Sequence, residues 1–141
     1  MNYSLCERIC MSTLFGVLLL GILLMSCNRH YEYRIVLTSG INEQGLPIDV
    51  REDFRITEEK IYIFMRWVNL QEKDNEYEVK IYDGKGNLVA TRRQQFTAET
   101  GSSNTWMWYK LNKALDYPGE WKYIVYLNGY KIKEQKFKVL F

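Results

Sequence analysis

The sequence is poor in several residue types on which common chemistries depend. Its 141 residues contain one histidine, His30, only two prolines, and three cysteines, Cys6, Cys10 and Cys27. One imidazole leaves most histidine-based catalysis without a base and most zinc sites without enough ligands. The formal net charge is only +2, from 19 basic and 17 acidic residues, so we expect no nucleic-acid partner.

The abundant residue types indicate a folded chain. Hydrophobic residues make up 47% of the sequence and aromatic residues 15%, which excludes an intrinsically disordered protein. A length of 141 residues suits one domain, because two separate cores would each be too small to be stable.

The N-terminal 26 residues differ from the rest of the chain. No charged residue occurs from Ile9 to Ser26, and Glu7 and Arg8 stand just before this stretch. A short charged start followed by an apolar run is typical of a secretory signal peptide, which we expect to be helical. The alternative is an uncleaved transmembrane anchor, since the 18 uncharged residues from Ile9 to Ser26 reach the lower end of the spanning length of about 17–25.

The apolar run ends in Leu24-Met25-Ser26-Cys27, which resembles the lipobox of bacterial lipoproteins. The resemblance implies cleavage after Ser26, diacylglycerol on the Cys27 thiol and acylation of the new amine, with no other cofactor. Two or three acyl chains anchor a protein stably, at about 0.8 kcal/mol per buried methylene. Asn28 is not the aspartate that retains such proteins in the inner membrane of enteric bacteria, so the resemblance favours the outer membrane of the cell envelope.

Processing at this site would divide the chain into a signal peptide (1–26), a lipidated N-terminus and tether (27–30) and a domain (31–141). The mature chain would then retain one cysteine, Cys27, and could form no internal disulfide. Cys6 and Cys10 have no nearby partner ligands, so we expect no metal site.

The domain is predicted to be an antiparallel β-sandwich of about seven strands, because β-branched and aromatic segments alternate with turns. Asp83–Asn87 predicts one hairpin turn and Asn128-Gly129 another. A change of parity near Glu134–Lys136 predicts a β-bulge in the last strand. The expected strands are Tyr31–Ser39, Ile61–Val68, Tyr77–Tyr82, Leu88–Thr91, Trp106–Leu111, Trp121–Leu127 and Tyr130–Val139.

The segment from Pro118 to Val139 resembles the closing hairpin of bacterial immunoglobulin-like domains, a group that includes fibronectin-III-like folds. Domains of this kind bind, space or scaffold, and the fold itself implies no activity. We expect Ile61–Val68 to be a buried central strand, with Trp67 and Trp121 in the core.

Three aromatic residues, Trp106, Trp108 and Tyr109, form a candidate binding face. Exposed aromatic rings can stack on sugars or anchor a protein interface. The alternative is that most of these rings fill the core. Strand parity separates Trp106 and Trp108 from Tyr109, so we expect at least one of the two tryptophans to be exposed.

Four lysines of the last strand, Lys131, Lys133, Lys136 and Lys138, form a candidate basic stripe for anionic lipids or acidic glycans. The alternative is that they protect the edge of a sheet against aggregation, because lysines on an edge strand discourage pairing with other chains.

The sequence contains no Gly-x-Ser-x-Gly elbow, phosphate-binding loop or cluster of histidine and cysteine, so no catalytic residue is assigned. We therefore expect a non-enzymatic, lipid-anchored envelope protein whose domain binds a protein partner or assists assembly. One alternative is a glycan-binding module that uses the aromatic face. The other is a small envelope hydrolase, since a pair of the many carboxylates could cleave a glycoside.

Overall fold

The computed structural model describes residues 31–57 and 60–141, and all of its regular elements are strands. The expected signal helix, Ser26 and Cys27 lie outside the described residues. Within the described ranges, no segment forms a helix that could span a lipid bilayer. The strands are β1 (Glu32–Thr38), β2 (Asp53–Arg55), β3 (Lys60–Val68), β4 (Asp74–Tyr82), β5 (Leu88–Thr97), β6 (Ser103–Lys110), β7 (Gly119–Leu127) and β8 (Tyr130–Leu140).

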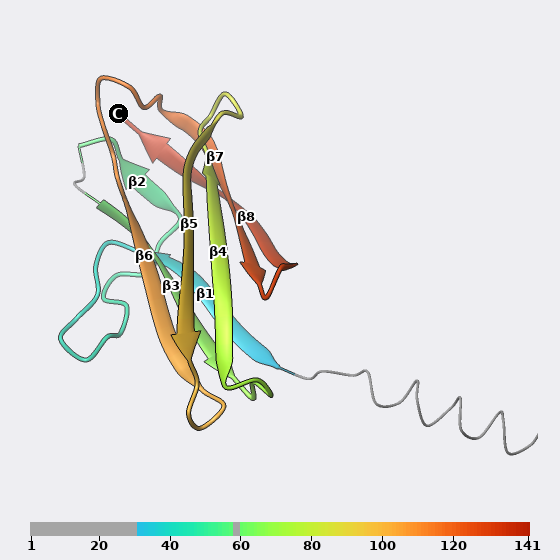
Figure 1. Cartoon of the computed structure of the whole chain (residues 1–141). Helices are drawn as coiled ribbons and strands as arrows, with labels where there is room; N and C mark the ends of the chain where they lie inside the picture. The colour runs from blue at the N-terminus through green and yellow to red at the C-terminus, as the bar shows by residue number, and fades with distance from the viewer. Residues whose placement is uncertain (1–30, 58–59) are drawn as a thin grey trace, which may run out of the picture. The chain divides into compact units, whose positions relative to one another are not determined.

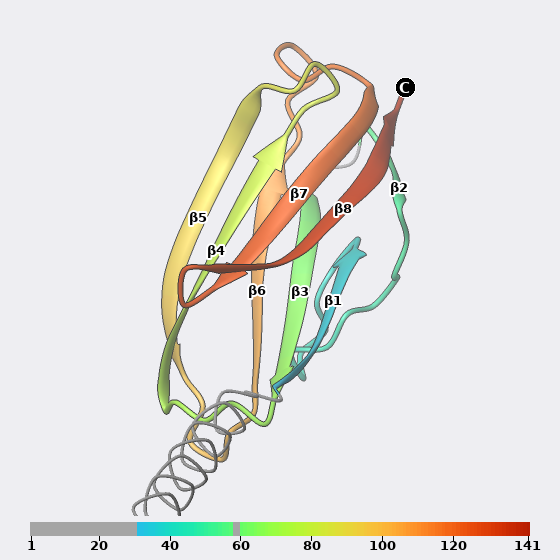
Figure 2. The same ribbon diagram turned by 90° about the vertical axis from the view of Figure 1, so that its right-hand side faces the viewer.

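These strands form two sheets, which confirms the all-β prediction (Figures 1 and 2). One sheet has the order β1-β3-β6, and the other has the order β2-β8-β7-β4-β5. The structure has eight strands where about seven were predicted, and the prediction of antiparallel pairing is wrong for one pair, because β2 pairs with β8 in parallel. With three residues, of which only Phe54 is buried, β2 is too short to show an alternating pattern.

The core lies between the two sheets and contains the inward-facing residues of both. Alternation is clearest in β4, where Tyr77, Val79 and Ile81 are buried. Trp67 on β3 and Trp121 on β7 are both 0% exposed, which confirms that they belong to the core. Full burial of one large apolar side chain stabilises a fold by about 1.5–3 kcal/mol, so these residues dominate its stability.

Strand β3 is the central strand of its sheet, as predicted. Its inner face contributes Ile61, Ile63 and Trp67 to the core. Phe64 points to the opposite face, where its neighbours in register are Val36 and Trp106, and it is only 2% exposed. The outer face of β3 is covered only in part, since Phe64 is buried there whereas Arg66 is exposed.

The two predicted hairpins are present, but the strands beside the first are longer than expected. Asn128 and Gly129 have φ angles of 49° and 84°, as a type I′ turn requires. Strand β5 continues to Thr97, beyond the predicted end at Thr91, and β6 begins at Ser103, before the predicted start at Trp106. The polar run of β5 hides its strand character, because it shows no alternation.

The irregularity in β8 lies at Ile132 and not near Glu134–Lys136. Val125 pairs with Lys133 and Tyr126 pairs with Lys131, so Ile132 is the extra residue. Lys133 therefore shares the inner face with Phe137 and Val139, whereas Tyr130 and Phe141 are exposed. An inward lysine is tolerated here because its ammonium group has a partner across the core.

That partner is on the other sheet, and the contact closes one side of the molecule. The Nζ atom of Lys133 donates a hydrogen bond of 2.7 Å to the Ile35 carbonyl of β1. The Tyr33 hydroxyl of β1 donates a bond of 2.8 Å to the Ile132 carbonyl. These two hydrogen bonds join β1 to β8, and we refer to this contact as the β1–β8 seam.

Candidate binding site on strand β6

Trp106 and Trp108 lie on the outer face of the three-stranded sheet. Their side chains are 41% and 52% exposed, whereas Thr105 and Met107 between them are buried. This alternation follows from the period of two in a strand, and it confirms the expectation that at least one of the tryptophans is exposed. Binding by this face stays a prediction.

Each indole ring is held against a neighbour rather than standing free. The Lys60 ammonium lies 4.6 Å from the centroid of the Trp108 ring, a cation–π contact across the β3–β6 pair. The Trp106 ring lies beside Gly45, where an added Cβ would come within 3.4 Å of the ring. The two rings are therefore supported from the side while their remaining surface faces solvent.

Gly45 belongs to a tight turn whose geometry depends on Asn42. The Asn42 side-chain oxygen accepts hydrogen bonds from the backbone N–H groups of Gln44 and Leu46, at 3.0 and 2.9 Å. Gly45 has a φ angle of 74°, which favours glycine. Leu46, which follows Gly45 in this turn, is also exposed.

Tyr109 does not belong to the candidate face, which corrects the prediction that grouped it with Trp106 and Trp108. It points to the inner side of the sheet, where its ring centroid lies 5.9 Å from that of Trp121. Its hydroxyl donates a hydrogen bond of 2.9 Å to Asp116. Burial and the Asp116 carboxylate raise the pKa of Tyr109, so the hydroxyl stays protonated and serves the fold.

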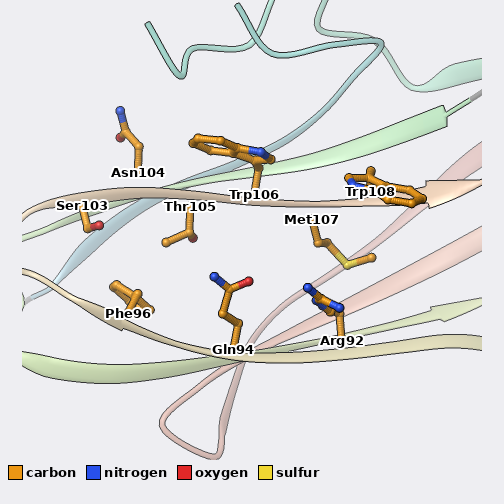
Figure 3. Close-up of a pocket in the computed structure, with 9 residues that line it drawn as sticks. All are labelled: Arg92, Gln94, Phe96, Ser103, Asn104, Thr105, Trp106, Met107 and Trp108. Carbon is orange, nitrogen blue, oxygen red and sulfur yellow. The ribbon is translucent and has the colours of Figure 1, made fainter. Parts of the chain in front are cut away.

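A groove of about 510 Å³ runs between β5 and β6, on the side of the molecule opposite the β1–β8 seam (Figure 3). Arg92, Gln94 and Phe96 point from β5 toward β6, and Thr105 and Met107 point back toward β5. Figure 3 also shows Trp106 and Trp108 on the other side of β6. Trp106 and Trp108 nevertheless contribute to the lining of the groove, so the groove and the aromatic pair share strand β6.

The hydroxyl group of Tyr77 on β4 lies deep beside this groove. It is 3.2 Å from the Trp106 carbonyl and 3.1 Å from the Gln94 side-chain oxygen, and it can donate its proton to one of them at a time. Burial raises the pKa of Tyr77, and the positive charge of Arg92 partly opposes this rise. The positive charge of the Arg92 guanidinium is therefore felt by the Tyr77 hydroxyl beside the groove.

The four lysines of the candidate stripe do not form one continuous basic surface. Lys133 faces inward, and burial lowers its pKa. Lys131 forms an ion pair with Glu134, and the Lys136 ammonium lies 2.6 Å from the Glu120 carboxylate. The hydrogen bonds to these two acids raise the pKa values of Lys131 and Lys136. Lys138 is exposed and makes no ion pair with any residue that the structure describes.

The carboxylates with shifted pKa values in the described ranges are suited to structural contacts. A hydrogen bond from Arg93 lowers the pKa of Glu78, and one from Lys131 lowers that of Glu134. A general acid needs the opposite shift, toward neutral pH. In residues 31–57 and 60–141, no group of three histidine, cysteine or acidic residues could hold a metal ion.

The comparisons with known proteins concern the fold alone. No family model matches the sequence, and no curated protein matches it. Residues covering 79% of the chain are similar to part of the Pseudomonas fluorescens alkylpurine DNA glycosylase AlkC, with a TM-score of 0.52 and 12% identity. A β-glucosidase of Listeria innocua also matches, with a TM-score of 0.48 and 11% identity. The chain spans 30% and 16% of these two proteins, respectively.

The sequence interpretation found the aromatic pair but missed the groove beside it. The missing side is β5, whose predicted end at Thr91 left out Arg92, Gln94 and Phe96. The sequence offered one indication that the strand continues, the aromatic residue Phe96 at the end of the polar run. In the structure its ring stacks on the core residue Trp67, with centroids 5.8 Å apart.

Proposed function

We propose that this chain is a lipid-anchored, non-enzymatic protein of the bacterial cell envelope whose domain binds a protein partner, as an accessory or assembly subunit. The observation that carries the proposal is the exposed pair Trp106 and Trp108 on a rigid sheet. Tryptophan is enriched among the residues that dominate binding energy in protein interfaces, because burial of its large ring removes much apolar surface from water.

The location and the anchor rest on the sequence Leu24-Met25-Ser26-Cys27. In this proposal Cys27 carries the lipid, and residues 27–30 connect it to β1. The short connection keeps the domain near the membrane surface, on the side away from the cytoplasm, with the outer membrane as the favoured location.

The finer fold that we propose is an immunoglobulin-like sandwich. Two sheets of three and five strands around one core, together with the Asn128-Gly129 hairpin that closes the chain, support this proposal. The parallel β2–β8 pair and the three-residue β2 are features of this chain that depart from a simple antiparallel sandwich.

A glycan is the second candidate ligand, and the spacing of the two rings favours it. Side chains two residues apart on a strand lie about 6.5–7 Å apart on the same face, so Trp106 and Trp108 offer two adjacent platforms for sugar rings. Quenching of tryptophan fluorescence by a series of soluble cell-wall oligosaccharides tests this alternative, since Trp67 and Trp121 are buried and should not respond.

The test of the main proposal is site-specific cross-linking in the native envelope. A photoreactive phenylalanine analogue at Trp108 of the full, lipidated chain should form a discrete adduct with one protein. The same analogue at Tyr130, which is 71% exposed at the β7–β8 turn, is the matched control. Absence of an adduct at Trp108, or the same adduct at both positions, would contradict the proposal.

A further inference from the structure

The edge strands of the two sheets differ in how they are protected against pairing with another chain. The β1 edge is joined to β8 by the seam, and β2 is only three residues long. Strand β5 carries two adjacent charges, Arg92 and Arg93. Charges, short length and coverage are the usual devices that prevent edge pairing.

Strand β6 is less protected, with a charged residue only at its end, Lys110, and with the Tyr77 hydroxyl 3.2 Å from its Trp106 carbonyl. From Ser103 to Tyr109 it contains no charged residue and no proline, and its pairing with β3 is continuous. An uncharged, aromatic edge of this length is a ready template for an additional strand.

The backbone groups along this edge have a definite direction. The Trp106 carbonyl is near the Tyr77 hydroxyl of the other sheet, so it points away from β3. In an antiparallel strand the N–H and C=O of one residue point to the same side, and residues two apart repeat this direction. Asn104, Trp106 and Trp108 therefore present their backbone groups toward the groove between β6 and β5.

The charge in this groove indicates what chemistry it would accept. Arg92 is the only ionised side chain in its lining, which contains no carboxylate. Its guanidinium makes no ion pair within the described residues, whereas the adjacent Arg93 is paired with Glu78 and Glu76 on the outer face. An incoming segment with a carboxylate would pair with Arg92 in the bidentate geometry that guanidinium groups favour.

We infer that the free edge of β6 binds an extended segment of the partner protein as an added strand, with an acidic side chain directed at Arg92. The inference rests on the proposed partner-binding function and specifies how it is achieved. Alternate side chains of the added strand would contact Trp106 and Trp108 on the outer face and Phe96 and Met107 in the groove. Main-chain hydrogen bonds would supply affinity, and these side chains would supply specificity.

A second copy of this chain fits the site less well. The stretch from Ser103 to Tyr109 of another copy has no carboxylate for Arg92. Strand β5 of another copy would bring Arg92 and Arg93 beside the same charge, which is unfavourable between adjacent strands.

The test uses the full chain in detergent micelles and a phage-displayed library of random peptides. Phages that bind the Arg92→Gln variant are removed first, and those that then bind the unsubstituted chain are kept. The probe is the most enriched peptide, synthesised with a fluorescent label. We expect this peptide to contain alternating apolar residues and an acidic residue. Its affinity for the Arg92→Gln variant should be about tenfold lower than for the unsubstituted chain, as expected for loss of one charge-assisted hydrogen bond. The matched control Arg93→Gln removes the neighbouring charge on the opposite face and should leave affinity unchanged.

Backbone pairing is tested with two N-methylated forms of the same peptide, one methylated at odd residues and one at even residues. At least one form should lose binding, because its amides can no longer donate to the β6 carbonyls. Three results would overturn the inference: no enrichment over Arg92→Gln, equal affinity for both arginine variants, or full binding by both methylated forms. A cross-link at Trp108 together with any of these results would leave the broader proposal standing.

Discussion

The indole N–H of Trp67 donates a buried hydrogen bond of 2.9 Å to the Thr105 hydroxyl. Trp67 is a core residue of β3, and Thr105 is the residue of β6 that directly precedes the exposed Trp106. The bond therefore fixes the inner side of the strand whose outer side carries the candidate binding face.

Replacing Thr105 with valine should lower the free energy of unfolding by about 1–3 kcal/mol, because the buried Trp67 N–H loses its acceptor. Thr105→Ser keeps the hydroxyl and is the matched control, with a smaller loss from one methyl group. Urea denaturation of both variants measures the difference. Equal stability of the valine and serine variants would show that the hydrogen bond contributes nothing.

Three of the four tryptophans, Trp67, Trp121 and Trp108, should fall into two classes. Trp67→Ala or Trp121→Ala should cost about 3–5 kcal/mol, because each leaves a cavity in the core. Trp108→Ala should cost less than about 1 kcal/mol, the range for exposed sites, and should weaken partner binding while the fold survives. Chemical denaturation with circular dichroism measures all three. A Trp108→Ala variant as unstable as Trp67→Ala would exclude this surface as a dispensable binding face.

Asp83 should make the domain sensitive to acid. Burial alone would raise the pKa of Asp83, but hydrogen bonds from Asn87 and from the Lys85 backbone outweigh it and lower the pKa. The native state therefore favours the ionised form, and this stabilisation is present above the unfolded pKa of about 3.9 and lost as the pH falls through the lowered value.

Asp83→Asn should therefore be less stable than the parent at pH 7, with a difference that shrinks toward pH 2. Unfolding free energies measured by urea titration between pH 2 and 7 check this. Two parallel curves over that range would contradict the assignment of a lowered pKa to Asp83.

Asn128 should contribute through both its backbone and its side chain. Its oxygen accepts a hydrogen bond of 2.8 Å from the Glu76 N–H, and its amide donates one of 2.9 Å to Asn75. Asn128→Gly loses both bonds but accommodates the positive φ angle. Asn128→Ala loses both and adds about 1–2 kcal/mol of left-handed strain, so it should be the less stable variant by thermal denaturation. The reverse order would show that backbone strain is absent.

Cys27→Ser should abolish labelling with radioactive palmitate and leave an unprocessed precursor that is visible by its larger mass. The matched control is Cys10→Ser, which removes a thiol within the same segment and should be labelled and cut normally. A Cys27→Ser chain that is still labelled and still cleaved after Ser26 would refute the lipoprotein interpretation.

Local patterns predicted the elements whose environment is set by neighbours in sequence. Asn128-Gly129 identified its turn because positive φ angles at both central residues restrict which residues fit. Strand β3 was recognisable because its inner face is fully buried and Phe64 is buried on the outer face, so its sequence is apolar over most of its length, with Arg66 as the exception.

The wrong predictions concern residues whose environment is determined by contacts with distant parts of the chain. Lys133 was expected on the surface, yet its aliphatic stem faces the core and its ammonium is satisfied by the Ile35 carbonyl, almost a hundred residues away in sequence. Strand β2 exists because Phe54 fits against Phe137 with centroids 6.2 Å apart, a contact that its three residues do not reveal. The groove exists because the edge strands β5 and β6 of the two sheets lie apart from each other. The alternation of residues along a single strand contains no information about the distance between two sheets.

The order β1-β3-β6 has a mechanical consequence if the domain is anchored at Cys27 and binds a partner through β6, as we propose. A pulling force that enters at Glu32 and leaves through a partner on β6 travels within one sheet, through the β1–β3 and β3–β6 ladders. Seven residue pairs of β1 and β3 would resist this load together along the strand direction. Tension between a membrane and a partner would thus run along the three-stranded sheet, and the five-stranded sheet would share the load through the two hydrogen bonds of the β1–β8 seam.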